Sequence, residues 1–132
     1  MTKQDWKIDV AKLCQRMAGR KDAEFFKEPV DWESLGLLDY PTIISKPMDL
    51  KTLRQNLDKG IYSRPGEFAA DMRLIFSNAM TYNIPGSRVY NHAKSLGDFF
   101  ETSWVQLVND CDDIDKPPTK ETLTVFVEKV HL

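Results

Sequence analysis

The chain has little of what metal-binding, disulfide-rich and membrane proteins need. Among its 132 residues are two cysteines, Cys14 and Cys111, and two histidines. The wide separation of the cysteines suggests neither a disulfide framework nor a zinc ligand set, so a reducing compartment is expected. No run approaches the roughly 20 apolar residues of a membrane span, and the amino-terminal residues lack a signal-peptide core. We expect neither a metal site nor membrane association.

Positive charge is not in excess, and the usual catalytic motifs are missing. The formal net charge is −2, whereas a nucleic-acid-binding face is usually basic, so direct nucleic-acid binding is not expected. The sequence has no Gly-rich phosphate loop, no Ser or Cys nucleophile motif and no cluster of His with carboxylates. These absences predict a protein that is not an enzyme and needs no cofactor. An apolar fraction of 42% nevertheless suits an ordinary globular domain.

Two amphipathic helices are predicted in the first sixty residues. Gly19 is well placed to end the first helix, since glycine takes the left-handed conformation without steric penalty. Asp49 suits the N-cap of the second helix, and Gly60 suits its end. The apolar stripes comprise Trp6, Val10, Leu13, Cys14 and Met17 in the first helix and Leu50, Leu53 and Leu57 in the second.

Two further helices are predicted in the second half. Pro65 suits the first position of the third helix, and Glu67 adds favourable charge in its first turn. The fourth helix is expected from about Val89 to Val108. The inward positions are Phe68, Met72, Ile75, Phe76 and Ala79 in the third helix and Val89, Ala93, Leu96, Phe100, Trp104 and Leu107 in the fourth. Four such helices without a sustained strand pattern predict an all-α four-helix bundle.

Residues 20–48 carry no convincing period, yet they are rich in large apolar side chains. Loops longer than about 15 residues are uncommon in compact domains unless they are functional or disordered. The composition argues against disorder, so we expect an ordered loop that packs on the bundle and forms a cleft at its end. The apolar residues are Phe25, Phe26, Val30, Trp32, Leu35, Leu37, Leu38, Tyr40, Ile43 and Ile44.

The carboxyl-terminal residues differ from the rest. Clustered acidic residues and two adjacent prolines between positions 110 and 118 are typical of a hinge. The apolar residues beyond them fit a helix or a strand equally well. We therefore divide the chain into a domain over 1–110 and a C-terminal hinge and tail extension over 111–132.

Several runs of residues resemble the bromodomain family. They are Glu28-Pro-Val-Asp31, Leu35-Gly-Leu-Leu-Asp-Tyr40, Ile43-Ile-Ser-Lys-Pro-Met-Asp-Leu50, Glu67-Phe-Ala-Ala-Asp-Met-Arg-Leu-Ile-Phe-Ser-Asn78 and Thr81-Tyr-Asn83. The similarity spans roughly residues 5–110 in collinear order. It implies a left-handed four-helix bundle with a long ordered loop between helices one and two. It also implies recognition of N-acetyl-lysine, usually on histone tails.

The same resemblance implies roles for eight residues. Asn83 would donate its side-chain N–H to the acetyl carbonyl, and Tyr40 would reach that carbonyl through an ordered water. Val30, Leu35 and Leu37 would line the loop side, Phe26 would border the acetyl methyl, Tyr82 would lie beside the asparagine, and Val89 would narrow the entrance. Asparagine suits this role because it is a neutral donor and tolerates the left-handed conformations found at helix ends. On its spacing alone, ahead of Ile84-Pro-Gly86, Asn83 is more simply explained as a helix C-cap.

The resemblance has one departure, because Glu24 and Phe25 stand where the family often has a tryptophan and a proline. We expect a non-catalytic reader of acetyl-lysine, whose partners are acetylated histone or other acetylated protein tails. We also expect a monomeric, nuclear module of a larger chromatin-associated complex. The alternative is a bromodomain-like interaction scaffold whose pocket is degenerate because of the Glu24-Phe25 change.

Overall fold

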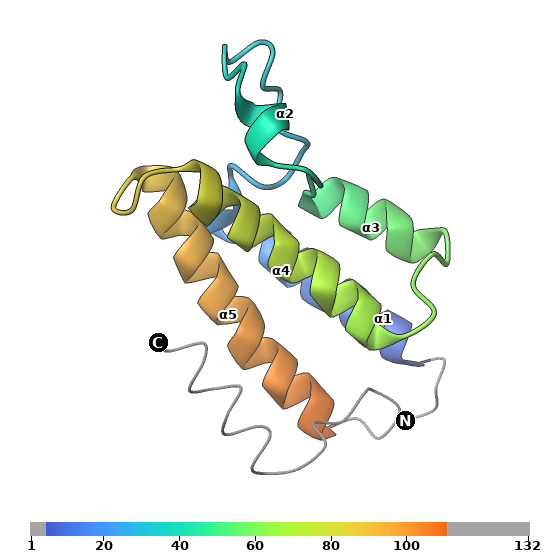
Figure 1. The fold of residues 1–132 in the computed structure, drawn as a ribbon. Helices are drawn as coiled ribbons and strands as arrows, with labels where there is room; N and C mark the ends of the chain where they lie inside the picture. Colours follow the sequence, from blue (N-terminus) through green and yellow to red (C-terminus); the bar gives the residue numbers. More distant parts are fainter. Residues whose placement is uncertain (1–4, 111–132) are drawn as a thin grey trace.

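Four helices pack against one another within residues 5–110, the part of the chain that the computed structural model describes. They are α1 (Asp5–Ala18), α3 (Leu50–Asp58), α4 (Pro65–Tyr82) and α5 (Arg88–Asp110). A short 3-10 helix, η1 (Lys21–Ala23), and the single-turn α2 (Tyr40–Ile43) lie in the connection between α1 and α3. Figure 1 shows α2 standing beyond one end of the bundle. The predicted all-α bundle is confirmed, while the predicted hinge and tail lie outside the described residues.

Helix α3 begins and ends where the sequence predicted. The buried carboxylate of Asp49 accepts hydrogen bonds from the Thr52 backbone N–H at 2.9 Å and the Thr52 hydroxyl at 2.6 Å. At the other end Gly60 has φ +75°, and the N–H of Ile61 donates to the carbonyl of Asn56 at 3.0 Å. This bond satisfies one of the free carbonyls at the helix end, in the manner of a Schellman motif.

The predicted conformation of Gly19 is wrong, although α1 does end beside it. Gly19 is not among the described glycines with positive φ. Its N–H still donates to the carbonyl of Gln15 at 3.1 Å, and the backbone N–H of Arg20 donates to the carbonyl of Met17 at 3.2 Å. The helix therefore ends by tightening into a three-residue turn that leads toward η1, and this satisfies the last carbonyls without a left-handed residue.

Helix α4 begins at Pro65, as predicted, and Glu67 caps it. The Glu67 carboxylate accepts from the backbone N–H of Ser63 at 2.7 Å and of Arg64 at 3.1 Å. These bonds, together with one from the Ser63 hydroxyl at 2.9 Å, hold the pKa of Glu67 below its ordinary value. Glu67 thus satisfies the N–H of the N-cap residue Arg64, which the start of a helix leaves unpaired, and that of the preceding residue Ser63.

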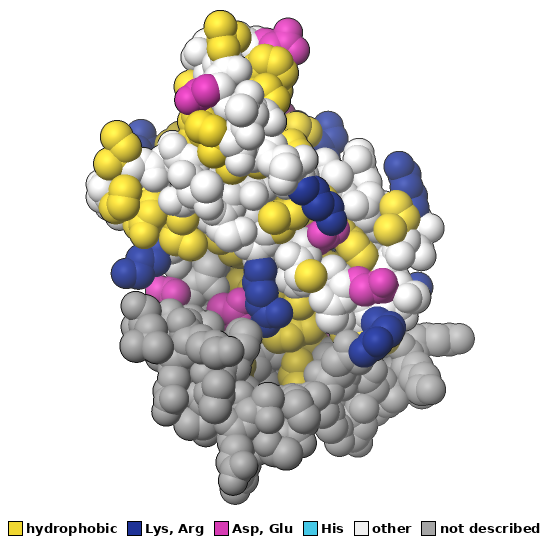
Figure 2. Space-filling model, viewed as in Figure 1, with side chains coloured by type: hydrophobic (Ala, Val, Ile, Leu, Met, Phe, Trp, Pro, Cys, Tyr) yellow, Lys and Arg dark blue, Asp and Glu magenta, His cyan; other side chains and the backbone are white. Residues whose placement is uncertain are grey.

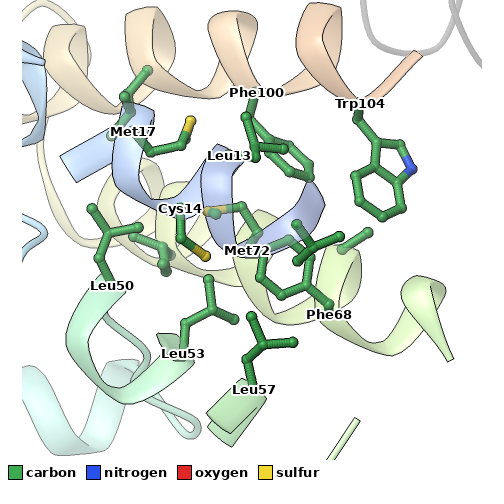
Figure 3. Close-up of a cluster of buried hydrophobic side chains, with 14 of the residues drawn as sticks. Leu13, Cys14, Met17, Leu50, Leu53, Leu57, Phe68, Met72, Phe100 and Trp104 are labelled. Carbon is green, nitrogen blue, oxygen red and sulfur yellow. The ribbon is translucent and has the colours of Figure 1, made fainter. Parts of the chain in front are cut away.

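The apolar stripes of α1, α3, α4 and α5 meet in a single core, part of which is drawn in Figure 3. Trp104 stacks on Phe68 at 6.0 Å and on Phe100 at 5.6 Å between ring centroids. Toward the end of α5, Val108 is buried, whereas the predicted Leu107 is only partly buried. The largest of the fully buried side chains are Val10, Leu13, Met17, Leu53, Phe68, Met72, Leu96 and Phe100.

The segment 20–48 packs on the bundle only in part. Phe26, Tyr40 and Ile44 are buried, as expected for an ordered loop. Leu35 and Leu38, however, remain 64% and 74% exposed. Figure 2 shows hydrophobic side chains gathered on the lobe that projects at the top, where Figure 1 places α2 and its neighbours. No helix of the described chain covers this lobe, so its outer side chains have no apolar surface to pack against.

Two leucines with different environments test this account of the core. Leu53 is fully buried, whereas Leu38 is 74% exposed. We expect Leu53→Ala to lower the free energy of unfolding by about 2–5 kcal/mol because it leaves a cavity. Leu38→Ala, the matched control, should change it by less than about 0.5 kcal/mol. Urea denaturation of both variants measures the difference, and equal effects would contradict the assignment of Leu53 to the core.

Candidate functional site

A pocket opens at the end of the bundle where the loop meets the last turn of α4 and the first turn of α5. Its volume is about 130 Å³, which is room for several waters or for the end of one side chain. The loop supplies one wall, and the helix ends supply the other. Residues far apart in the sequence therefore share one site.

All eight residues singled out from the sequence lie around this pocket. The structure brings together Phe26, Val30, Leu35, Leu37, Tyr40, Tyr82, Asn83 and Val89. Phe26 and Tyr40 are buried, Leu35 is exposed at the mouth, and the others are half-buried or nearly so. That they contact an acetylated lysine stays a prediction.

Six further lining residues were not singled out. They are Phe25, Glu28, Met48, Ile75, Asn78 and Ala79. Ile75 and Ala79 precede Asn83 by eight and four positions, so helical spacing places all three on one face of α4 and could have identified them. For Phe25 and Glu28 the sequence holds no such signal, because the wall they form depends on the path of an aperiodic loop.

Asn83 is the C-cap of α4 and also part of the pocket wall. Its backbone N–H and its side-chain Nδ2 both donate to the carbonyl of Ala79, at 3.0 and 2.9 Å. The backbone is extended, with φ −98° and ψ 151°, so the expectation of a left-handed conformation is wrong. An extended residue ends the helix just as well because it turns the next N–H away from the helix axis. The amide has two N–H donors, and one of them remains for a ligand.

Two tyrosines lie next to each other in the pocket wall. The Tyr40 and Tyr82 rings meet edge to face, with centroids 4.9 Å apart. Burial raises the pKa of Tyr40, since the charged form would lose its hydration. The Tyr82 hydroxyl donates to Asp39 at 2.6 Å, and this bond raises the pKa of Tyr82 to about 12. Both phenols are therefore neutral near pH 7.

Charged groups lie at the rim of the pocket. Glu28 is the one carboxylate among the residues that line it, and its side chain is 73% exposed and pairs with Lys51 at 3.6 Å. Within residues 5–110, no group of three or more His, Cys, Asp or Glu side chains could hold a metal ion. None of the described helices is long and apolar enough to cross a membrane. The interior of the pocket is thus formed by apolar side chains and neutral polar groups.

The Glu24-Phe25 departure forms an ordered part of the rim. The Glu24 carboxylate accepts a hydrogen bond from Arg88 at 2.8 Å, which joins the loop to the first residue of α5. The Arg88 guanidinium lies 5.4 Å from the Phe25 ring centroid, and that ring lies 5.5 Å from the ring of His92. Phe25 is 36% exposed and forms part of the wall. It therefore does not fill the pocket.

Comparison with known proteins identifies similar sequences over most of the described chain. A family model described as Bromodomain matches residues 10–95. Transcription factor GTE9 of Arabidopsis thaliana is 50% identical over 95 residues, which cover 72% of this chain and 14% of that protein. Transcription factor GTE11 of the same plant is 47% identical over 92 residues, with 70% and 15% covered. Transcription factor GTE3, chloroplastic, is 43% identical over 104 residues, with 76% and 23% covered. The chain thus spans less than a quarter of each of these relatives.

The contribution of the Glu24–Arg88 ion pair to the free energy of unfolding can be compared with that of a less exposed pair, Arg73–Glu101. The Arg88 and Glu24 side chains are 71% and 47% exposed, whereas Glu101, paired with Arg73 at 2.7 Å, is 22% exposed. We expect Glu24→Gln to lower the free energy of unfolding by less than about 0.5 kcal/mol, because water screens exposed pairs. The control Glu101→Gln should lower it by about 1 kcal/mol, since its two-pronged pair is less hydrated. Urea denaturation distinguishes them, and a larger loss for Glu24→Gln would show that the rim supports the fold.

Proposed function

This chain belongs to the bromodomain family, and on that premise we propose that it binds N-acetyl-lysine in the pocket through the side-chain amide of Asn83. Family membership supports a role as a non-catalytic reader of acetylated lysine in general. The observation that carries the more specific proposal is the hydrogen bond from Asn83 to the Ala79 carbonyl. It fixes the amide at the pocket wall and leaves one N–H for an acceptor.

The chemistry of acetylation matches this arrangement. An acetylated lysine ends in a neutral amide on an apolar stem. In the proposed complex its carbonyl accepts from Asn83, its methyl lies near Phe26, and its methylenes lie between Val30 and the other apolar walls. An unmodified lysine would bring an ammonium ion into the same space. Losing hydration there without a buried carboxylate would cost several kcal/mol. Discrimination would thus rest mainly on exclusion of the charged form.

Tyr40 is proposed to hydrogen-bond, through an ordered water, to the acetyl carbonyl that Asn83 also binds. Its phenol is neutral at physiological pH, as tyrosine ordinarily is, and burial raises its pKa further, so it remains a donor. Polar pockets commonly retain waters that satisfy leftover donors and acceptors. The pocket volume of about 130 Å³ is consistent with a ligand end together with such waters.

The alternative is an interaction scaffold whose pocket is degenerate because of the Glu24-Phe25 change, for example because Phe25 fills it. Instead, Glu24 is engaged with Arg88 at the rim, and Phe25 forms part of the wall of an open pocket. These observations favour the reader. We propose acetylated histone tails or other acetylated protein tails as partners, and a monomeric module of a chromatin-associated complex in the nucleus. The relatives named as transcription factors support that setting, although GTE3 and GTE5 carry the description chloroplastic.

Asn83 variants test the proposal directly. Asn83→Ala should weaken binding of acetylated peptides at least tenfold, because a hydrogen bond in a desolvated pocket is lost and the carbonyl is left unpaired. Asn83→Asp keeps the shape but has no N–H, so it should fail as well. Unfolding stability of Asn83→Ala should fall by no more than about 1 kcal/mol, for the lost bond to Ala79.

Calorimetric titration of singly and doubly acetylated histone-tail peptides, each with its unmodified counterpart, provides the measurement. We expect the wild type to bind some acetylated peptides with micromolar affinity, since one anchored side chain makes a small interface. Equal binding of acetylated and unmodified peptides by the wild type would exclude the reader role.

A further inference from the structure

The outer part of the loop has few ties to the bundle. Between residues 29 and 45, Tyr40 and Ile44 are the buried side chains, while Leu35 and Leu38 are exposed. The backbone hydrogen bonds of this segment run within the segment itself. Among the described residues, the hydrogen bond that connects its side chains to the four packed helices is the one from the Tyr82 hydroxyl to Asp39. Just beyond the segment, Lys46 pairs with Asp71 at 3.1 Å and its carbonyl accepts from Asn78 at 2.8 Å. Within residues 29–45, the position of the loop wall depends on the Tyr82–Asp39 bond and on the packing of Tyr40 and Ile44.

This contact lies next to the two residues that are proposed to act on the acetyl carbonyl, Tyr40 and Asn83. Asp39 directly precedes Tyr40, and Tyr82 directly precedes Asn83. The hydroxyl of Tyr82 lies 2.6 Å from the Asp39 carboxylate, and the Tyr82 ring packs edge to face on Tyr40. A hydrogen bond to a carboxylate is generally stronger than one between neutral groups, although this pair lies at an exposed position. The two bonded residues are therefore covalent neighbours of Tyr40 and Asn83.

The Asp39 side chain does not cap the adjacent helix α2. Asp39 is the N-cap residue of α2, yet its side chain makes no capping bond. Its backbone carbonyl alone accepts from Thr42 and Ile43, both at 3.1 Å. Replacing the carboxylate therefore removes the link to Tyr82 and leaves the backbone bonds that begin α2.

We propose that Asp39 and Tyr82 form a positioning pair that holds the Tyr40 wall of the pocket in register with Asn83. The inference rests on the proposed function, because it assigns the pair a part in binding N-acetyl-lysine. Neither residue needs to bond the acetyl group. When the bond is absent, the loop must be ordered at the moment of binding, and that ordering weakens the affinity.

Removal of the hydroxyl or of the carboxyl group separates the hydrogen bond from the packing of the Tyr82 ring. Tyr82→Phe keeps the ring against Tyr40 and should weaken acetylated-peptide binding about fivefold, the loss expected for one net hydrogen bond. Asp39→Ala should weaken it by a similar factor. Asp39→Asn retains a carbonyl oxygen as acceptor and should restore part of the loss. The double variant Tyr82→Phe/Asp39→Ala should be no weaker than either single variant, because both remove the same bond.

Tyr90→Phe is the matched control, because Tyr90 lies in α5 and is not among the residues that line the pocket. It should leave peptide affinity unchanged. In the absence of peptide, amide hydrogen exchange over residues 31–44 should quicken in Tyr82→Phe and Asp39→Ala, while exchange in α4 and α5 stays as in the wild type. The melting temperature should change little, which distinguishes positioning from a general loss of stability.

A titration of the phenols by ultraviolet absorbance reports on the bond itself. In the wild type the Asp39 carboxylate raises the pKa of Tyr82 to about 12. In Asp39→Ala one phenol should titrate closer to 10. Unchanged affinity of Tyr82→Phe, or additive losses in the double variant, would overturn the positioning pair. A wild type that binds no acetylated peptide would instead overturn the proposed function, while loop exchange and phenol titration would still report whether the bond orders the loop.

Discussion

The side-chain amide of Asn83 is held by the carbonyl of Ala79, and the arrangement of the site follows from that bond. The Ala79 carbonyl accepts the last backbone hydrogen bond of α4, from the N–H of Asn83, and its second lone pair accepts from the Asn83 side chain. The residue that ends the helix therefore has its recognition group oriented by the helix itself. The same residue is therefore both the C-cap and the donor proposed for acetyl-lysine, and these two interpretations do not compete.

This bond has a fixed position only because α4 is rigid. Phe68 and Met72 are fully buried in the core, and Phe76 is buried beside α5. The loop differs, since much of its outer surface is exposed and its ties to the helices are few. The molecule thus combines a rigid helix end, which carries Asn83, with a loosely anchored wall, which carries Tyr40. Contacts between the two, such as the one from Tyr82 to Asp39, decide how well the wall and the donor remain aligned.

Much of this architecture could be predicted from the sequence, and the failures have physical causes. The helical stripes were predictable because burial imposes a period of 3.6 residues, and Asp49 and Gly60 were predictable because caps have narrow chemistry. Gly19 misled because a helix can also end by tightening its last turn. The loop has no hydrophobic period, so its sequence predicted neither the formation of α2 nor the exposure of Leu38. The eight pocket residues came from a family resemblance, whereas Phe25 and Glu28 depend on a loop path that no local pattern encodes.

The distribution of charge explains why a pocket of this kind would read acetylation. Tyr40 and Tyr82 are neutral near pH 7, as ordinary phenols are, and burial of Tyr40 and the Asp39 bond of Tyr82 raise their pKa values further. Glu24, Arg88 and Glu28 lie at the rim, where water and their partners screen them. A neutral interior has nothing with which to compensate an ammonium ion, whereas a neutral amide needs only one donor. Under the proposed function, the choice between acetylated and unmodified lysine would thus be made inside the pocket and would depend little on salt. Preferences for flanking residues would arise at the charged rim and would weaken as ionic strength rises.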